Sequence, residues 1–233
     1  MRNNYVVNKI RCLLSVDLKN IIFAPSNNVS MFLKLYPENP NPRYIKMIIE
    51  CLENDGVVIF PTDTIYGIGC SINSNKAIER IARIKGIKKE KANFSFIFHD
   101  MSMLSDFTRP INNDVFKMMK RNLPGPFTFI LEANNNVPKI FKNNKKTIGI
   151  RIPDQPIITN IVRELGCPIL TTSIVDEDEI SGFMTDPEEI NDAYKDKVDI
   201  IIDGGFGNKE ESTIVDCTEN EIIIVREGKG ILD

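Results

Sequence analysis

The chain has 233 residues, of which 42% are hydrophobic and 26% charged, and its formal net charge at pH 7 is −3. This composition is typical of a soluble globular protein, and the acidic balance disfavours a protein that binds nucleic acid over its whole surface. No apolar run approaches the roughly 18 residues needed to span a bilayer, so we expect a cytoplasmic protein without a membrane partner.

Cysteine and histidine narrow the possible chemistry. The five cysteines are scattered and never occur at CxxC spacing, which fits a reducing compartment and disfavours a disulfide framework or a thiolate zinc site. His99 is the only histidine, so a site built from several histidines is excluded, and a Ser-His-Asp triad would have to use His99. Catalysis must therefore use lysine, arginine, carboxylates, hydroxyls and backbone amides.

The first 30 residues differ from the rest of the chain. They are rich in asparagine, contain Asp17 as their only acid and show no hydrophobic period. Three interpretations of residues 1–30 stay open: a disordered amino-terminal extension, a targeting arm, or the product of an upstream mis-start. We assign residues 31–233 to one domain.

From Pro42 onward, helix and strand patterns alternate. Asn41 can cap a helix that starts at Pro42, and Val57–Phe60 is a continuous β-branched and aromatic run typical of a buried strand. Ser74 can cap a second helix that runs to Ile84. The same patterns predict strands at 94–98, 127–131, 147–152, 168–172, 198–202, 213–216 and 221–225, and helices near 113–122, 156–165 and 187–194.

This alternation predicts an α/β fold with helices flanking one sheet. Short turns join the last strands, which predicts a mixed sheet rather than a purely parallel one. Charge is uneven along the fold, because residues 76–91 carry seven basic and two acidic side chains, whereas residues 176–189 carry seven acidic and no basic ones. The basic segment can bind phosphate, and it can equally be a solvated helix face.

Residues 61–69, Pro-Thr-Asp-Thr-Ile-Tyr-Gly-Ile-Gly, form the loop with the densest polar chemistry. The loop follows a predicted strand, and ligands of open α/β sheets collect at the carboxyl ends of strands. Gly67 and Gly69 allow a ligand close to the backbone. No Walker lysine loop occurs and no GxGxxG motif follows a strand, so any nucleotide site has a less common design. We interpret Gly204–Gly207 as a plain turn.

Several short motifs then follow in a fixed order. They are Pro61-Thr-Asp-Thr-Ile-Tyr-Gly-Ile-Gly69, Lys85, Asn93, Pro124-Gly-Pro-Phe-Thr128, Gly149-Ile-Arg-Ile-Pro153, Thr171-Thr-Ser173, Asp203-Gly-Gly205, Ser212-Thr-Ile-Val-Asp216 and Arg226-Glu-Gly228. Each motif alone is weak, but this order resembles the YrdC/YciO family over roughly residues 32–230. The resemblance implies an open twisted sheet with a large basic cavity on one face.

The resemblance also implies an activity. Members of the YrdC branch make threonylcarbamoyl-adenylate from L-threonine, bicarbonate and ATP, which carries Mg²⁺, and they release pyrophosphate. A partner complex then transfers the threonylcarbamoyl group to an adenosine of transfer RNA. Such chemistry needs little histidine, because the protein mainly positions reactants and neutralises phosphate charge.

Site residues follow from the matching positions. The resemblance makes Thr64 and Ser212 candidates for holding threonine. It makes Lys85, Lys88 and Arg151 the candidate catalytic charges of the cavity, with no metal ligand among the side chains. It makes Asn93, Thr128, Ser173 and Arg226 candidates for binding ATP. Each position keeps an ordinary alternative as a turn or strand residue or as a surface ion-pair partner.

The chain departs from the YrdC branch at several positions. Ile87 stands where that branch has an arginine, and the neighbouring lysine lacks the planar fork that arginine offers a phosphate. Val175 replaces an asparagine and Phe98 replaces a histidine. His99 lies one step further, which turns it to the opposite side of a strand. The YciO branch has similar losses, so the chain resembles that branch most closely.

Three functions stay open from the sequence. The first is a synthase-type nucleotidyltransferase of transfer RNA modification, which forms threonylcarbamoyl-adenylate. The second is a hydrolase of threonylcarbamoyl groups, favoured by the missing arginine and asparagine. The third is a module that binds double-stranded RNA or transfer RNA without chemistry, whose affinity would fall steeply with salt.

Overall fold

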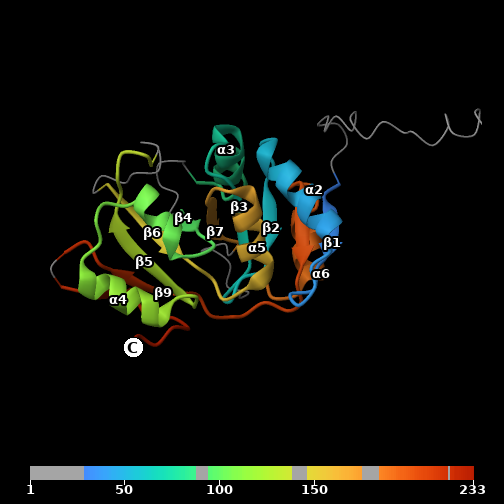
Figure 1. The fold of residues 1–233 in the computed structure, drawn as a ribbon. Coiled ribbons are helices and arrows are strands. Elements are labelled where there is room, and N and C mark those ends of the chain that lie inside the picture. Colours follow the sequence, from blue (N-terminus) through green and yellow to red (C-terminus); the bar gives the residue numbers. More distant parts are fainter. Residues whose placement is uncertain (1–28, 88–93, 138–145, 175–183, 220) are drawn as a thin grey trace, which may run out of the picture.

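The structure is a computed structural model that describes residues 29–87, 94–137, 146–174, 184–219 and 221–233 (Figure 1). Within these ranges ten strands form one sheet, in the order β1-β8-β2-β3-β7-β4-β6-β5-β9-β10. The strands are β1 Met31–Lys34, β2 Val58–Phe60, β3 Gly67–Ser71, β4 Ser95–Ile97, β5 Phe127–Glu132, β6 Thr147–Arg151, β7 Ile169–Ser173, β8 Ile200–Asp203, β9 Thr213–Asp216 and β10 Ile223–Arg226.

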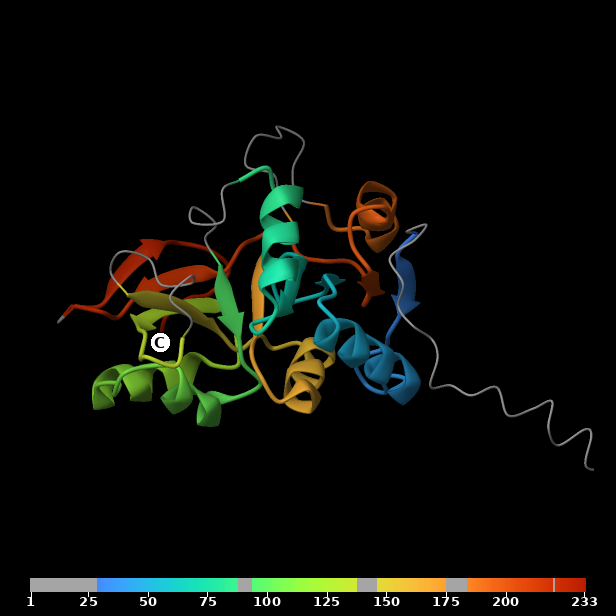
Figure 2. The ribbon, with the colours of Figure 1, turned by 90° about the horizontal axis from the view of Figure 1, so that it is seen from above.

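Helices flank this sheet. They are α2 Pro42–Glu53, α3 Asn75–Ile84, α4 Asn113–Asn122, α5 Pro156–Leu165 and α6 Pro187–Tyr194, together with the 3-10 helix η3 Met101–Asp106. Seen from above, α3 and α6 lie on one side of the sheet, and α2 and α5 lie on the other (Figure 2). None of the described helices is long and apolar enough to cross a membrane.

The strand directions are mixed. Strands β1 and β2 both run parallel to β8, β3 is antiparallel to β2 and to β7, and β9 and β10 form an antiparallel pair at one edge. The strands turn from the nearly vertical β2 to the oblique β5 in Figure 1, as the usual twist of a sheet requires. The expected α/β class with an open mixed sheet and flanking helices is confirmed.

Local signals explain most helix starts. The side chain of Asn41 accepts a hydrogen bond from the backbone N–H of Arg43 at 3.0 Å, and Pro42 occupies the first helical position of α2. The hydroxyl of Ser74 accepts from the N–H of Ala77 at 3.0 Å at the start of α3. These contacts satisfy donors that a helix leaves unpaired at its first turn, so the predicted caps are confirmed.

The sequence patterns miss two strands. β1 is a short strand whose parallel pairing with β8 comes from a distant part of the chain. β3 lies inside the segment that the sequence analysis assigns to a loop, because its Gly67 and Gly69 resemble turn residues. The prediction of a loop up to Gly69 is wrong: pairing with β2 and β7 makes the segment a central strand, and only residues 61–66 form the turn.

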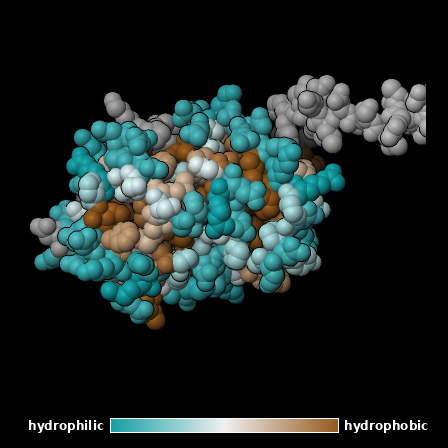
Figure 3. All heavy atoms as spheres, in the orientation of Figure 1, coloured by the Kyte–Doolittle hydropathy of each residue, from teal (hydrophilic) through white to brown (hydrophobic). Residues whose placement is uncertain are grey.

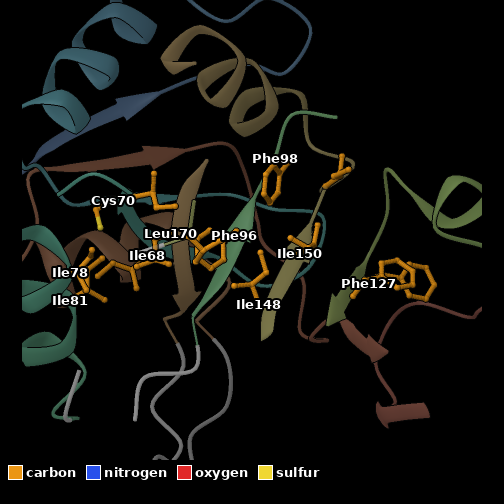
Figure 4. Close-up of a cluster of buried hydrophobic side chains, with 14 of the residues drawn as sticks. Ile68, Cys70, Ile78, Ile81, Phe96, Phe98, Phe127, Ile148, Ile150 and Leu170 are labelled. Carbon is orange, nitrogen blue, oxygen red and sulfur yellow. The ribbon is translucent and has the colours of Figure 1, made fainter. Parts of the chain in front are cut away.

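Alternate residues of the central strands face two separate apolar cores, as the period of two in a strand requires. The first core includes Phe96, Leu170 and Ile150 of the sheet with Ile78 and Ile81 of α3, which gather between that helix and the strands (Figure 4). The second core joins sheet residues of the opposite parity with α2 and α5. It includes Phe60, Ile97, Ile169, Ile200, Ile48 and Ile158.

The second face becomes polar beyond the cover of α5. The register pairs Gly69 with Thr171, Thr171 with Ser95, and Ser95 with Gly149, so small residues form one row across four strands. A Cβ atom on Gly149 would come within 3.1 Å of the Thr128 methyl carbon. The ring of Phe60 covers this row at Gly69, where an added Cβ atom would meet it at 2.9 Å, whereas Ser95 and Gly149 are half-buried. Arg151 follows Gly149 on the same face of β6, and the candidate site lies at this end of the row.

Candidate functional site

The turn at 61–66 holds the hydroxyl of Thr64 in a fixed position. The hydroxyl of Thr62 accepts from the N–H of Thr64 at 3.1 Å and donates to the carbonyl oxygen of Ile65 at 2.7 Å. The two threonine hydroxyls lie 3.0 Å apart. Because Thr62 gives its only proton to Ile65, the proton of this contact belongs to Thr64. Thr64 is fully buried, and its oxygen remains able to accept.

Arg151 reaches this turn from the end of β6. Its Nη2 donates to Thr64 Oγ1 at 2.8 Å and to Asp63 Oδ1 at 2.9 Å, while the other carboxylate oxygen of Asp63 accepts from the N–H of Asp154 at 3.1 Å. Burial lowers the pKa of the Arg151 guanidinium, Asp63 opposes that fall, and nearby Arg226 adds to it. The Nε of Arg151 is buried and has no hydrogen-bond partner among the described residues, so it is an unsatisfied donor beside this turn.

A second cluster joins β5, β9 and β10. The hydroxyls of Thr128 and Ser212 lie 2.8 Å apart, and both residues are buried. Arg226 donates to the carbonyl oxygen of Ser212 through Nε at 3.2 Å and Nη2 at 2.8 Å. Its Nη1 lies 2.7 Å from a carboxylate oxygen of Glu211.

The two clusters belong to one site. The pairing of Phe129 with Ile150 places Thr128 beside Arg151 at the next position of the β5–β6 ladder. The charge of Arg226 lowers the pKa of the Arg151 guanidinium, and the charge of Glu211 raises it. The structure therefore brings together five of the positions singled out from the sequence: Thr64, Arg151, Thr128, Ser212 and Arg226. We name this group the hydroxyl–arginine cluster.

Lys85 and Ser173 form a separate contact. Lys85 caps the end of α3, and its Nζ donates to the backbone carbonyl oxygen of Ser173 at 3.0 Å. Ser173 is half-buried and pairs with Gly67 at the start of β3. Ile87, at the position expected for arginine, is 39% exposed. Lys88, Asn93 and Val175 lie outside the described residues.

Two basic side chains of the segment at residues 76–91 form ion pairs. Lys76 lies 3.2 Å from Asp55, and Arg80 lies 2.6 Å from Asp199. Both pairs attach α3 to neighbouring loops. The described part of this segment therefore fits a solvated helix face with structural ion pairs, which is one of the two sequence interpretations.

His99 is not part of the hydroxyl–arginine cluster. Its Nε2 lies 3.1 Å from a carboxylate oxygen of Asp100, and its ring is 17% exposed. The preceding Phe98 is fully buried in the first apolar core. This arrangement agrees with the expectation that His99 and Phe98 lie on opposite sides of the strand.

The glycine-rich residues 204–207 do more than form a turn, because they contact the segment that carries Thr64. The hydroxyl of Tyr66 donates to the carbonyl oxygen of Gly205 at 2.7 Å and accepts from the N–H of Gly204 at 3.2 Å. The N–H of Asn208 donates to the carbonyl oxygen of Thr64 at 3.1 Å. Burial raises the pKa of Tyr66 to about 12. The interpretation of a plain turn was therefore incomplete, because residues 204–208 support the Thr64 turn from behind.

Sequence reasoning also missed three charged side chains of the site. Asp63 holds Arg151, Glu211 holds Arg226, and the Nζ of Lys229 donates to the backbone oxygen of Asp63 at 2.6 Å. Asp63 lies inside the motif at residues 61–69, and Glu211 and Lys229 are the chain neighbours of the motif residues Ser212 and Gly228. That proximity was the available signal, but only the fold shows what they contact. No group of three or more His, Cys, Asp or Glu side chains in the described residues could hold a metal ion.

The chain is similar to known proteins over most of its length. The Sua5/YciO/YrdC family model, described as "Telomere recombination", matches residues 50–228. YciO of Escherichia coli K12 is 38% identical over 204 residues, which are 87% of this chain and 97% of that relative. The threonylcarbamoyl-AMP synthase of Bacillus subtilis is 31% identical over 81% of this chain and 54% of that relative.

Solved structures share the fold. The crystal structure of E. coli YciO has a TM-score of 0.80 and 37% sequence identity, and the match covers 87% of this chain and 97% of that one. The crystal structure of P. abyssi Sua5 complexed with L-threonine has a TM-score of 0.78 at 24% identity, and the match covers 85% of this chain and 58% of that one. At this identity, the second likeness concerns the fold alone.

Proposed function

Because the chain belongs to the Sua5/YciO/YrdC family, we propose that it binds L-threonine at the hydroxyl–arginine cluster and forms threonylcarbamoyl-adenylate from L-threonine, bicarbonate and ATP. The observation that carries the proposal is the buried contact of Arg151 with Thr64 beside an unpartnered Arg151 Nε. Relatives that are threonylcarbamoyl-AMP synthases, and a fold relative complexed with L-threonine, support this assignment.

The contacts suit an amino acid. The Nε of Arg151 can donate to the carboxylate of threonine, and the hydroxyl oxygen of Thr64 can accept an N–H from its amine. Ser212 and Thr128 supply further hydroxyls beside Arg151. Such a site neutralises and orients the ligand in a buried place, where charge-assisted hydrogen bonds are strong.

The reaction then needs little proton transfer by the protein. The threonine nitrogen forms a bond to the carbon of bicarbonate with loss of water, and an oxygen of the resulting carbamate attacks the α-phosphorus of ATP. The bond between the α-phosphorus and the bridging oxygen breaks, and pyrophosphate leaves. Arg226, Ser173 and Lys85 are proposed to face the phosphates, while Mg²⁺ arrives with ATP as part of the substrate. The product would pass to a partner complex that modifies transfer RNA.

Hydrolysis of threonylcarbamoyl groups is the second candidate. The observation that favours it is Ile87, an exposed apolar side chain where the synthase branch has a guanidinium. A weaker grip on ATP would not impair attack of water on a threonylcarbamoyl substrate. RNA binding without chemistry gains no support, because Lys76 and Arg80, two of the described basic residues of the 76–91 segment, already form ion pairs within the chain.

Pyrophosphate release from the purified protein tests the proposal. The assay contains ATP and Mg²⁺, with and without L-threonine and bicarbonate. Release that requires both co-substrates is the expected result. Without such release from folded protein, the synthase assignment is wrong, and breakdown of threonylcarbamoyl-adenylate or of threonylcarbamoylated transfer RNA by the same protein would establish hydrolysis instead.

Variants tie the activity to the cluster. Thr64→Val and Ser212→Ala each remove one buried hydroxyl, and we expect each to lower threonine-dependent turnover about tenfold or more, since an unpaired polar group weakens binding. Thr108→Val is the matched control, because Thr108 is a buried threonine that donates to Leu104 at 2.9 Å. Equal losses in all three variants would indicate a general loss of stability and would remove the assignment to this site.

A further inference from the structure

Arg226 is already bound to an anion of its own chain. Its Nη1 lies 2.7 Å from the carboxylate of Glu211, and its Nε and Nη2 donate to the backbone oxygen of Ser212. The proposed function takes Arg226 as a phosphate ligand. A phosphate that binds the outer edge of this guanidinium must therefore compete with Glu211 for the same donors.

The two arginines of the site differ in how firmly they hold their carboxylates. The side chain of Asp63 is 7% exposed and is fixed by both Arg151 and the N–H of Asp154. The side chain of Glu211 is 31% exposed, and the side chain of Arg226 is 36% exposed. Asp63 is therefore held firmly against Arg151 by burial and a second hydrogen bond. Glu211 is in contact with solvent, so a competing anion can displace it.

We propose that Glu211 is a specificity-determining residue that lowers the affinity of the site for polyphosphates by occupying Arg226. The inference rests on the proposed function, because it assigns Arg226 to the phosphates, and it adds which phosphates the site tolerates. A ligand with several negative charges must break the Glu211 contact and then lie beside a displaced carboxylate. A ligand with a single negative charge meets much less repulsion.

The surroundings of Glu211 provide matched controls. A shallow depression of about 370 Å³ next to Arg226 is lined by Glu211, Glu210, Glu227, Lys209 and Gly228. Glu210 and Glu227 are exposed, and no described ion pair joins either carboxylate to Arg226. Replacing any of the three glutamates by glutamine removes one negative charge from the same surface, but only Glu211→Gln changes the carboxylate that contacts Arg226.

The test uses pyrophosphate as the probe. Calorimetric titrations at constant ionic strength compare the full-length wild-type protein with Glu211→Gln and Glu210→Gln. We expect Glu211→Gln to bind pyrophosphate about fivefold or more tightly than wild type, because charge-assisted contacts to the freed guanidinium are strong, and we expect Glu210→Gln to stay within about twofold. If only Glu211→Gln binds pyrophosphate detectably, that outcome also supports the inference.

A second comparison shows whether Arg226 carries the effect. In an Arg226→Gln background, the further change Glu211→Gln should no longer tighten pyrophosphate binding, as in a double-mutant cycle. Thermal unfolding of each variant checks that the protein is folded. The inference is overturned if Glu211→Gln binds no more tightly than wild type, if Glu210→Gln gains equally, or if the gain persists without Arg226.

Threonine binding separates this inference from the proposed function. The same proteins are titrated with L-threonine, which has no phosphate. If wild type fails to bind threonine while Glu211→Gln still gains affinity for pyrophosphate, the threonine assignment fails and the role of Glu211 stands. If threonine binds and the pyrophosphate gain is absent, only the role of Glu211 is lost.

Discussion

The two ends of the candidate site are built differently. At the proposed threonine end, Thr64, Arg151 and Ser212 are buried and use one another or close neighbours as hydrogen-bond partners. At the proposed phosphate end, Ser173 is half-buried and Ile87 is 39% exposed. The departure from the synthase branch at Ile87 belongs to the proposed phosphate end.

This difference has a physical cause. A buried hydroxyl or guanidinium cannot be replaced without leaving its partner unpaired, so substitution at the threonine end harms folding as well as binding. An exposed side chain can change at almost no cost in stability. The proposed phosphate end is therefore free to vary within the fold, and the type of reaction can change while the proposed threonine site is kept.

Replacing Arg151 should have the largest effect. Arg151→Met leaves the buried carboxylate of Asp63 without a positive charge beside it, and we expect a fall of about 3 kcal/mol in the free energy of unfolding together with loss of threonine binding. Urea denaturation and calorimetry measure the two effects. Arg163→Met on α5, whose side chain is exposed, is the control and should change stability by about 0.5 kcal/mol or less. Wild-type stability of Arg151→Met would show that the threonine end is not a coupled network.

Alkaline pH should lower the stability that the buried phenol of Tyr66 contributes next to the Thr64 turn. Burial raises the pKa of Tyr66 to about 12, above its value near 10 in an unfolded chain. The neutral phenol therefore contributes stability fully below pH 10, and that stability is lost as the pH rises toward 12.

The loss due to Tyr66 should amount to about 2 kcal/mol between these pH values. Tyr66→Phe removes the ionisable group, so its unfolding free energy should fall less between pH 9 and pH 11.5 than that of wild type. Urea denaturation at the two pH values measures this. Tyr36→Phe, at a 60% exposed position, should behave like wild type, and an identical fall in Tyr66→Phe would contradict the assignment.

Restoring arginine at the phosphate end should have the smallest effect on the protein and a selective one on binding. Ile87→Arg places a guanidinium on an exposed position, so stability should change by about 0.5 kcal/mol or less. We expect ATP to bind about threefold or more tightly, because a bidentate donor is added, while threonine affinity is unchanged. Ile87→Gln is the neutral control. A matching gain in Ile87→Gln, or a changed threonine affinity, would show that the two ends are not independent.

Much of this fold can be predicted from local sequence patterns. The caps at Asn41 and Ser74 and the buried run at Val58–Phe60 all appear where the patterns predict them. Strand β3 is different, because its glycines indicate a turn and only pairing with two neighbouring strands makes it a strand. Long-range pairing of this kind leaves no local signal.

The site shows the same limit. Motif positions identified Thr64, Arg151, Thr128 and Ser212. The contacts of Arg151 with Thr64 and of Thr128 with Ser212 join segments far apart in the sequence. Asp63 and Glu211 form ion pairs with Arg151 and Arg226. The sequence placed Asp63 in a motif without indicating its partner, and it did not distinguish Glu211 from an ordinary surface acid. The sequence therefore identified positions of the site, whereas the pairing of each arginine with its carboxylate became evident only in the fold.

The most direct test of this account is the titration of the wild-type protein with L-threonine in the absence of nucleotide. We expect saturable binding to one site, since the proposed threonine end is assembled by contacts within the fold, and we expect weaker binding by Thr64→Val than by Thr108→Val. No binding by folded wild-type protein, or equal binding by the two variants, would contradict the assignment of the hydroxyl–arginine cluster to threonine.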